Sequence, residues 1–310
     1  IGKGMIGISM AVLFTGNRMV VWWLVLVYAM FGAAWLLSRR RKVRYWIPAA
    51  CSVLALCAVL TVNAVQLQRT STVTALDVSQ GQSIVFSSGR ACAVVDCGGR
   101  STVEDPGDLA ARKLLAQGHR SLDLLVLTHP HDDHINGVLR LMHWLPVRTL
   151  VIPAAADTTK APLSDILALA VENHTTVVRV DAERTVTAGS ISVHLYPEPC
   201  AGQEDGSMIV LTSIGDYDTL VPGDVDTTAE VKFLSSCTYP DIELLLVGHH
   251  GSKKSTSDAW LDAIAPDDAI ISVGYNNYGH PTSDTLERLQ AHHIPIYRTD
   301  QMGDITVHLS

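Results

Sequence analysis

The first 70 residues of this 310-residue chain contain no Asp, Glu or His. Every formal charge there is positive and comes from Lys3, Arg18, Arg39, Arg40, Arg41, Lys42, Arg44 and Arg69. The whole chain has 23 basic and 31 acidic residues, so the part after residue 70 has 15 basic and 31 acidic residues, together with all 13 histidines. Because binding many phosphates needs clustered Lys and Arg, the acidic balance of this part argues against a broad phosphate-binding surface.

Cysteine is also scarce, with six residues and no C-x-x-C pair, which argues against a zinc ribbon. Cys51 and Cys57 lie in an apolar run and are expected to be small buried hydrophobic residues. The others, Cys92, Cys97, Cys200 and Cys237, are scattered, and a disulfide between any two of them stays open. The chain has no internal repeat and no low-complexity tract.

Two long apolar runs, residues 19–37 and 45–65, flank five cations between residues 39 and 44. The first run has 19 uncharged residues, about the length that spans a hydrocarbon core of roughly 30 Å. Tryptophans 22, 23 and 35 lie toward its ends, where aromatic belts form. We predict transmembrane helices at about 19–37 and 45–65. The alternative is a buried helical hairpin of a soluble protein.

The cations between the two runs predict the orientation of the chain. The positive-inside rule places the loop 39–44 in the cytoplasm. The second helix then carries residues 71–310 back outside, so we expect a multi-pass protein of the cell membrane with an extracytoplasmic domain. Because the chain begins with Ile and leads straight into apolar sequence, we also expect it to be the C-terminal piece of a longer protein.

After residue 70 the pattern becomes that of an α/β enzyme. Short β-rich runs occur at 73–78, 83–86, 92–96, 122–127, 148–152, 191–196, 208–214, 219–221, 242–247, 269–273 and 305–309. Helix-compatible stretches lie at 109–117, 135–144, 164–172, 227–235, 256–264 and 283–292. This order predicts one domain, 71–310, with two mixed sheets packed face to face and helices outside.

The strongest chemical signal directly follows the apolar run 122–127. Three imidazoles and two carboxylates arrive within six residues, at His129, His131, Asp132, Asp133 and His134. In an extended loop the first two histidines point to the same side and can share an ion, while Asp133 and His134 turn toward a second position. Imidazole with carboxylate suits Zn²⁺, Mn²⁺ or Fe, and a mixed set with open positions is typical of catalytic sites.

Two further strand ends supply candidate ligands. Asp224 follows the run 219–221 and a turn, and on its own it would equally suit a turn or a helix N-cap. His249 and His250 follow the run 242–247 and Gly248. Assuming an extended chain, we assign His249 to the second ion with Asp133, His134 and Asp224, and His250 to the scissile phosphate or to support of a ligand.

The order H-x-H-x-D-H, then G-D, then a strand-end His resembles the metallo-β-lactamase superfamily. Finer motifs resemble its ComEC branch of DNA-uptake channel proteins. They are L-D-V-S-Q-G-Q-S at 76–83, V-V-D-C-G-G at 94–99, H-H-G-S-K-K-S at 249–255, S-V-G-Y-N-N-Y-G-H-P at 272–281 and the closing segment 297–303. The resemblance covers essentially all of residues 71–310. It implies the αββα sandwich of that superfamily, preceded here by two transmembrane helices.

The resemblance also implies a chemistry. Two divalent ions, Zn or Mn, would bind at His129, His131, Asp133, His134, Asp224 and His249. Asp133, His250, His280 and Lys253 would be the catalytic residues, with Lys253 holding a phosphate and His280 donating a proton or clamping substrate. Lys253 in a solvated helix start and His280 in a structural Gly/Pro turn are the alternatives. The superfamily's usual third histidine is not evident, because residues 204–207 hold its place without an imidazole.

The implied function is a nuclease or phosphodiesterase domain that degrades incoming single-stranded DNA during natural transformation. Its partners would be an upstream membrane channel domain of the same longer protein and membrane lipid. Two alternatives remain at this stage. One is an extracellular hydrolase of a small ester or lactone, and the other is a non-catalytic, metal-stabilised domain that guides DNA.

Overall fold

A computed structural model of the chain describes residues 18–39, 44–67, 70–100, 104–197 and 207–309. The helices are α1 (Arg18–Ser38), α2 (Trp46–Leu67), α3 (Pro106–Ala116), α4 (Asp132–Ile135), α5 (Val138–Trp144), α6 (Leu163–Glu172), α7 (Thr227–Ser236), the 3-10 segment η3 (Gly248–Gly251), α8 (Asp258–Ile264), α9 (Ser283–Ala291) and α10 (Thr299–Met302).

The strands form two seven-stranded sheets, ordered β14-β1-β2-β3-β4-β5-β6 and β13-β12-β11-β10-β9-β8-β7. The first contains β1 (Ser71–Ala75), β2 (Ile84–Ser88), β3 (Ala91–Val95), β4 (Leu122–Val126), β5 (Val147–Pro153), β6 (Thr176–Val180) and β14 (Ile305–Leu309). The second contains β7 (Arg184–Ala188), β8 (Ile191–Tyr196), β9 (Ile209–Ile214), β10 (Tyr217–Val221), β11 (Leu244–Leu246), β12 (Asp268–Ile271) and β13 (Ile296–Arg298).

Each sheet is half parallel. Strands β3 to β6 run parallel in the first sheet, and β10 to β13 run parallel in the second. The remaining neighbours, from β14 to β3 and from β7 to β10, are antiparallel. Because parallel strands end at the same edge, the loops after β3, β4, β10, β11 and β12 have the opportunity to meet.

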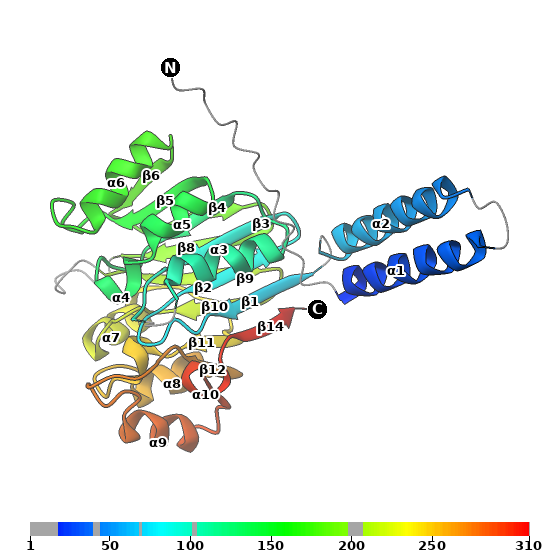
Figure 1. Cartoon of the computed structure of the whole chain (residues 1–310). Coiled ribbons are helices and arrows are strands. Elements are labelled where there is room, and N and C mark those ends of the chain that lie inside the picture. The colour runs from blue at the N-terminus through cyan, green and yellow to red at the C-terminus, as the bar shows by residue number, and fades with distance from the viewer. Residues whose placement is uncertain (1–17, 40–43, 68–69, 101–103, 198–206, 310) are drawn as a thin grey trace.

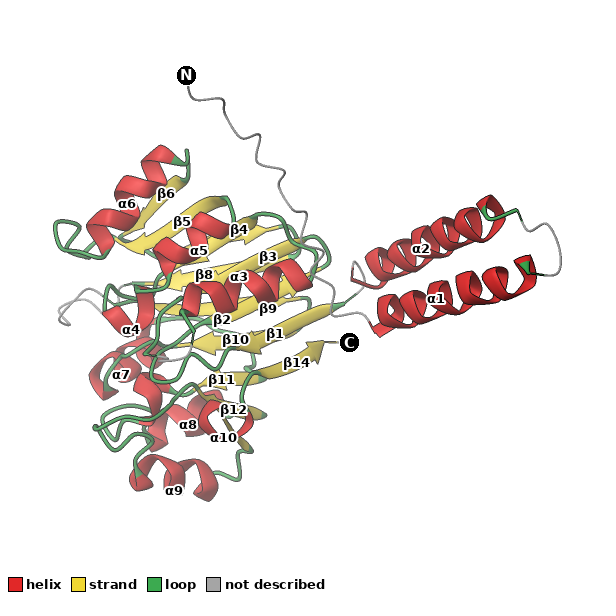
Figure 2. Cartoon of the chain, in the orientation of Figure 1, coloured by secondary structure: helices red, strands yellow, loops and turns green. Residues whose placement is uncertain are grey.

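Three separate hydrophobic clusters show that the domain has four layers. One cluster lies between the first sheet and α3, α5 and α6, a second between the two sheets, and a third between the second sheet and α7, α8 and α9. Residues on single strands alternate between clusters: Leu244 and Leu246 of β11 face the other sheet, while Leu245 faces the helices. The order helix, sheet, sheet, helix (Figures 1 and 2) confirms the predicted sandwich.

Three edge strands, β6, β7 and β13, were not predicted from the sequence. Only Val180 and Ala188 among their residues are buried, so these strands lack the continuous apolar run that marks a buried strand. The predicted helix 135–144 is instead interrupted between α4 and α5, at Gly137. A Cβ atom at Gly137 would approach the Gly107 nitrogen to 2.6 Å, so tight packing of this corner against α3 requires glycine.

The N-terminal helices form an antiparallel hairpin beside the domain (Figure 1), tied by a hydrogen bond from Trp23 Nε1 to the Ser52 carbonyl of 2.9 Å. In the described chain, one helix, at Met19–Ser38, is long and apolar enough to cross a membrane. The apolar part of α2, Trp46–Val62, is shorter than the roughly 20 residues that a span requires. The second predicted transmembrane helix therefore exists as a helix, but its crossing of a membrane is not confirmed.

Candidate metal centre

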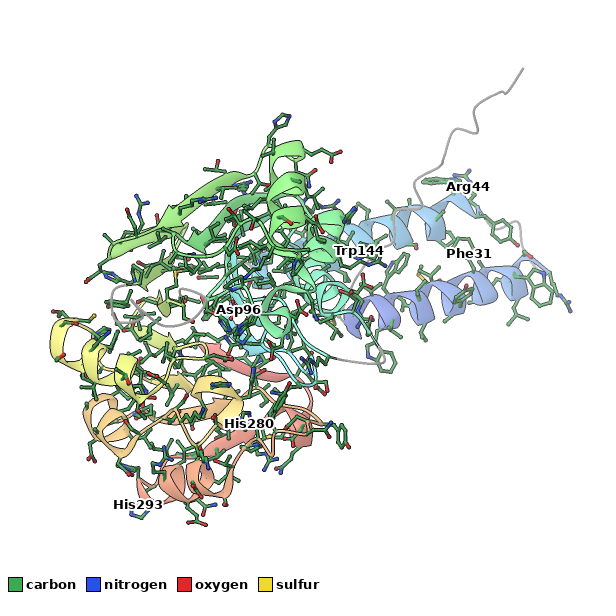
Figure 3. All side chains as sticks on the ribbon, turned by 90° about the vertical axis from the view of Figure 1, so that its left-hand side faces the viewer. Phe31, Arg44, Asp96, Trp144, His280 and His293 are labelled. Carbon is green, nitrogen blue, oxygen red and sulfur yellow. The ribbon has the colours of Figure 1, made fainter. Side chains whose placement is uncertain are left out.

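Five loops bring polar side chains to the carboxyl ends of the parallel strands. Asp96 follows β3, and His129 lies just beyond the end of β4, before α4 supplies Asp133 and His134. From the second sheet, Asp224 follows β10, and η3 after β11 carries His249 and His250. Figure 3 labels Asp96 and, on a loop of the second half of the domain, His280. The site is therefore built between the two sheets, and neither half contains it alone.

Asp96 is the buried anchor of the site, with no exposed surface. Its carboxylate accepts hydrogen bonds from the Thr128 nitrogen and hydroxyl at 2.7 Å each, from Gln82 Nε2 at 2.8 Å and from His134 Nδ1 at 2.7 Å. Its backbone is left-handed, at φ 58°. Asp96 was not predicted as a site residue from the sequence, although its place directly after a strand, in the V-V-D-C-G-G motif, was an available signal.

Hydrogen bonds fix which nitrogen of each buried imidazole is free to accept. His134 Nδ1 donates to Asp96, and His250 Nδ1 donates to the Ser272 carbonyl at 2.8 Å. The Thr128 hydroxyl uses its proton on Asp96 and therefore accepts from His129 Nδ1 at 3.1 Å. In each ring the proton is on Nδ1, so Nε2 keeps its lone pair. A metal ion binds a histidine in this tautomer through Nε2.

Asp224 lies at the centre of these imidazoles. One carboxylate oxygen, Oδ1, is 3.2 Å from His134 Nε2 and 3.9 Å from His250 Nε2. The other, Oδ2, is 3.7 Å from His129 Nε2 and 3.6 Å from His249 Nε2. A carboxylate with each oxygen facing different histidines has the geometry to bridge two ions.

Four of the converging atoms that could ligate a metal have no hydrogen-bond partner among the described residues. They are the Nε2 atoms of His129, His134 and His250 and the Oδ1 atom of Asp224. Two sets of ligand atoms each lie within 4.8 Å of one another: His129, His134 and Asp224, and Asp133, His134 and His250. Buried nitrogen and oxygen atoms left unpaired are costly unless a ligand satisfies them, so the residues present fit divalent cations.

The ionisation of the cluster agrees with this fit. Burial lowers the pKa of His129 well below its ordinary value, assisted by the neighbouring His134. Burial opposes the charged form of His134 too, but the carboxylates of Asp224 and Asp96 outweigh it and raise the pKa of His134. Burial likewise opposes ionisation of Asp224, yet His134 holds its pKa well below the usual range. The negative carboxylates of Asp96 and Asp224 favour a positive charge near His134. A bound cation would supply that charge.

The structure reverses the expected roles of the paired histidines. His250 is 3% exposed, and its Nε2 is 3.7 Å from Asp133 Oδ2, whereas His249 belongs to neither ligand set and is partly exposed. The expectation assumed an extended chain, but both residues are left-handed, at φ 50° and 54°. This turn, and not strand alternation, decides which ring points inward. His249 instead faces Asp224 from the rim.

The other predicted residues fall into two groups. His131 and His280 lie at the site: the His131 ring is 4.6 Å from that of His129, and the His280 ring is 5.6 Å from that of His249. Lys253 is exposed and does not line the cavity over the cluster. Residues 204–207 occupy the sequence position where the superfamily usually has its third histidine. Residues 204–206 lie outside the described residues, and Ser207 is buried.

A cavity of about 480 Å³ opens over the cluster. Its lining residues are Gln80, Arg100, Pro130, His131, Asp132, Asp133, Asp224, His249, His250, Tyr278 and His280. The cation in this lining is Arg100, from the loop after β3. An open pocket that reaches two groups of candidate metal ligands is an arrangement suited to metal-dependent hydrolysis.

Comparison with known proteins agrees with the sandwich. Residues 76–275 match the family model described as Metallo-beta-lactamase superfamily. ComE operon protein 3 of Bacillus subtilis is 30% identical over 251 residues, which are 74% of this chain and 32% of that protein. Competence protein ComA of Neisseria gonorrhoeae is 30% identical over 243 residues, 74% of this chain and 31% of that protein. The chain thus spans about a third of the length of these curated relatives, and the resemblance to competence proteins of the ComEC type is confirmed.

Among solved structures, the crystal structure of the metallo-beta-lactamase fold protein YhfI from Bacillus subtilis aligns with a TM-score of 0.52. The alignment covers 77% of this chain and 100% of that one at 14% sequence identity, so it supports the fold alone.

Proposed function

Since this chain belongs to the metallo-β-lactamase superfamily, we propose that residues 71–310 form a binuclear metal-dependent phosphodiesterase that cuts single-stranded DNA beside a membrane. The observation that carries the proposal is the convergence of three unpaired imidazole nitrogens and the Asp224 carboxylate beneath one open cavity. Zn²⁺ or Mn²⁺ bound there would activate water near neutral pH and stabilise negative charge on the reacting phosphate.

The chain's own residues have distinct tasks in this proposal. His129 and His131 would hold one ion, and Asp133, His134 and His250 would hold a second, with Asp224 within reach of both groups. Asp96 and Ser272 fix the ring orientations of His134 and His250 by hydrogen bonds to Nδ1. Asp133 faces the cavity as the group that orients the attacking water and accepts its proton, and His280 stands at the rim as the donor to the leaving group.

Two features support DNA over another ester. One relative that matches 74% of this chain is named competence protein ComA, and the cavity adds the Arg100 cation and the Tyr278 ring to the polar cluster. The acidic balance of 15 basic and 31 acidic residues after residue 70 limits contact to a short stretch of strand. A membrane channel domain upstream in the same longer protein, and lipid around α1, are the proposed partners. The apolar helix and the competence relatives indicate membrane association.

The test uses the full chain in detergent, stripped with a chelator and reloaded with Mn²⁺ or Zn²⁺. We expect two bound ions per chain and cleavage of end-labelled single-stranded DNA that depends on them. Asp224→Asn is expected to lose metal and at least about 100-fold in rate, because one oxygen facing the histidines becomes an amide. His293→Ala, an exposed histidine at the edge of the domain in Figure 3, is the matched control and keeps both.

Each alternative has its own outcome in that experiment. DNA that binds the metal-loaded chain without being cut would replace the proposal with a guiding domain. Hydrolysis of a small ester or lactone without cleavage of DNA would replace it with the small-molecule hydrolase.

A further inference from the structure

Tyr278 lies at the mouth of the cavity over the cluster, and its ring contacts the ring of His280. Tyr278 lines the cavity, yet 59% of its surface is exposed. Its ring centroid is 5.9 Å from that of His280, at 33°, and the His280 ring is 5.6 Å from that of His249. His249 in turn is 3.6 Å from Asp224. Contacts between successive rings thus connect the exposed Tyr278 to His280, His249 and the candidate metal ligand Asp224.

The loop that carries Tyr278 is held in place by one side chain. Asn276 donates through Nδ2 to the carbonyls of Gly274, at 2.9 Å, and His280, at 2.8 Å. Its Oδ1 accepts from the nitrogens of Tyr278 and His280, at 3.0 Å each. Four bonds from one amide fix the loop, so the exposed ring is presented in a defined position. A fixed aromatic ring loses little conformational freedom when a flat ligand stacks on it.

Polar groups surround the same ring. Arg100 Nη1 donates to the Tyr278 hydroxyl at 3.4 Å and supplies positive charge to the cavity lining. Gln80 is 2% exposed, lines the cavity, and its Oε1 has no partner among the described residues. The buried Nδ1 of His280 is unpaired in the same sense. The cavity mouth thus combines a flat apolar surface, a cation and unused hydrogen-bonding atoms.

We propose that Tyr278 and Arg100 form a nucleotide subsite, in which the base next to the scissile phosphate stacks on Tyr278 and Arg100 contacts the adjoining phosphate. This assignment rests on the proposed phosphodiesterase function and adds to it the recognition of a base. Stacking is worth about 1–3 kcal/mol per base and tolerates any sequence, because every base has a flat face. For a domain with 31 acidic and 15 basic residues, stacking supplies affinity that phosphate attraction does not.

The experiment compares a single-stranded oligonucleotide with the same strand containing abasic sites, using the full chain loaded with Mn²⁺. Tyr278→Ala should raise KM for the normal strand about tenfold, with little change for the abasic strand. Anisotropy of the labelled strands should give the same tenfold difference in Kd, whether or not cleavage occurs. Tyr275→Ala is the matched control, because Tyr275 is 89% exposed on the same loop but does not line the cavity.

The role of Arg100 is tested by the salt dependence of the affinity for single-stranded DNA. Each cation that contacts single-stranded DNA contributes about −0.7 to the slope of log affinity against log salt concentration. Arg100→Ala should make the slope about 0.7 shallower, while Arg179→Ala, an exposed arginine on β6, should leave it unchanged.

The outcomes separate the two proposals. If the unmodified chain cuts neither strand, the phosphodiesterase function fails, and anisotropy still decides the subsite. If Tyr278→Ala weakens normal and abasic strands alike, weakens neither, or is matched by Tyr275→Ala, the subsite is overturned even though cleavage stands.

Discussion

At the scale of single residues, the left-handed backbone of His249 and His250 decides which of the two rings joins the candidate ligand set of Asp133 and His134. We predict that His250→Ala binds one ion fewer per chain, because it removes the Nε2 that lies 3.7 Å from Asp133. His249→Ala is expected to keep both ions and to change mainly KM, because its ring lies at the rim in contact with His280. Metal content after gel filtration, measured by atomic emission, gives the answer. Loss of an ion from His249→Ala with full occupancy in His250→Ala would restore the assignment made from an extended chain.

At the scale of elements, the segment from η3 to the start of α8 is held by the helices around it. Glu230 of α7 is 1% exposed and accepts hydrogen bonds from the nitrogens of Thr256 and Ser257 and from the Ser257 hydroxyl. Arg288 of α9 donates to the carbonyls of Ser255 and Thr256. Burial raises the pKa of Glu230, and the Ser257 bonds partly offset this. The histidine turn therefore depends on contacts that lie on the helix side of the sheet.

We predict that Glu230→Ala destabilises the domain by about 3 kcal/mol, because one buried and two part-buried donors lose their acceptor. For a domain of this size that loss lowers the thermal midpoint by roughly 6–12 °C. It should also weaken binding of the second ion, since the turn carrying His250 is loosened. Thermal unfolding followed by circular dichroism, with and without Mn²⁺, measures both effects. Glu287→Ala, an exposed glutamate on α9, is the control and should shift stability by no more than about 0.5 kcal/mol. A Glu230 variant with unchanged stability would contradict this account.

At the scale of the whole molecule, the exposed apolar surface is concentrated in the helical hairpin. Of the 25 exposed large hydrophobic residues in the described chain, 19 lie between Met19 and Val65. Exposed apolar surface of this extent marks an interaction site, and together with the apolar helix at Met19–Ser38 it suggests association with a membrane. Whether the enzyme domain lies outside the cell depends on whether α2 also crosses, because a single crossing by α1 would leave the domain on the same side as the cationic loop.

We predict that α2 does cross. In a chain whose Cys51, Cys57, Cys200 and Cys237 are changed to Ser, Gln290→Cys on α9 should react with an impermeant thiol reagent on intact cells. Tyr45→Cys, next to the cationic loop, keeps all five charges and should react only after lysis. If the two cysteines react alike in intact cells, both labelled or both protected, α2 does not cross; labelling of Tyr45→Cys alone would mean that α2 crosses but leaves the domain in the cytoplasm.

The sequence by itself determined the elements whose signal is local. The short β-rich runs of the buried strands, the H-x-H-x-D-H cluster after β4 and the uncharged run at Met19–Ser38 are all contiguous in the sequence. Each is found in the structure where the sequence predicted it. Edge strands β6, β7 and β13 were missed because strands that are not buried need no apolar pattern.

Only the tertiary structure decided what depends on residues distant in the chain. Asp96 bonds to His134 across 38 positions, and His250 bonds to Ser272 across 22, so no local pattern fixes which imidazole nitrogen faces the cations. The choice of His250 over His249 depends on backbone angles that the surrounding loops impose on two adjacent, identical side chains. Tyr278 reaches the cavity for the same reason, because the loop after β12 folds back over the loop ends of both sheets.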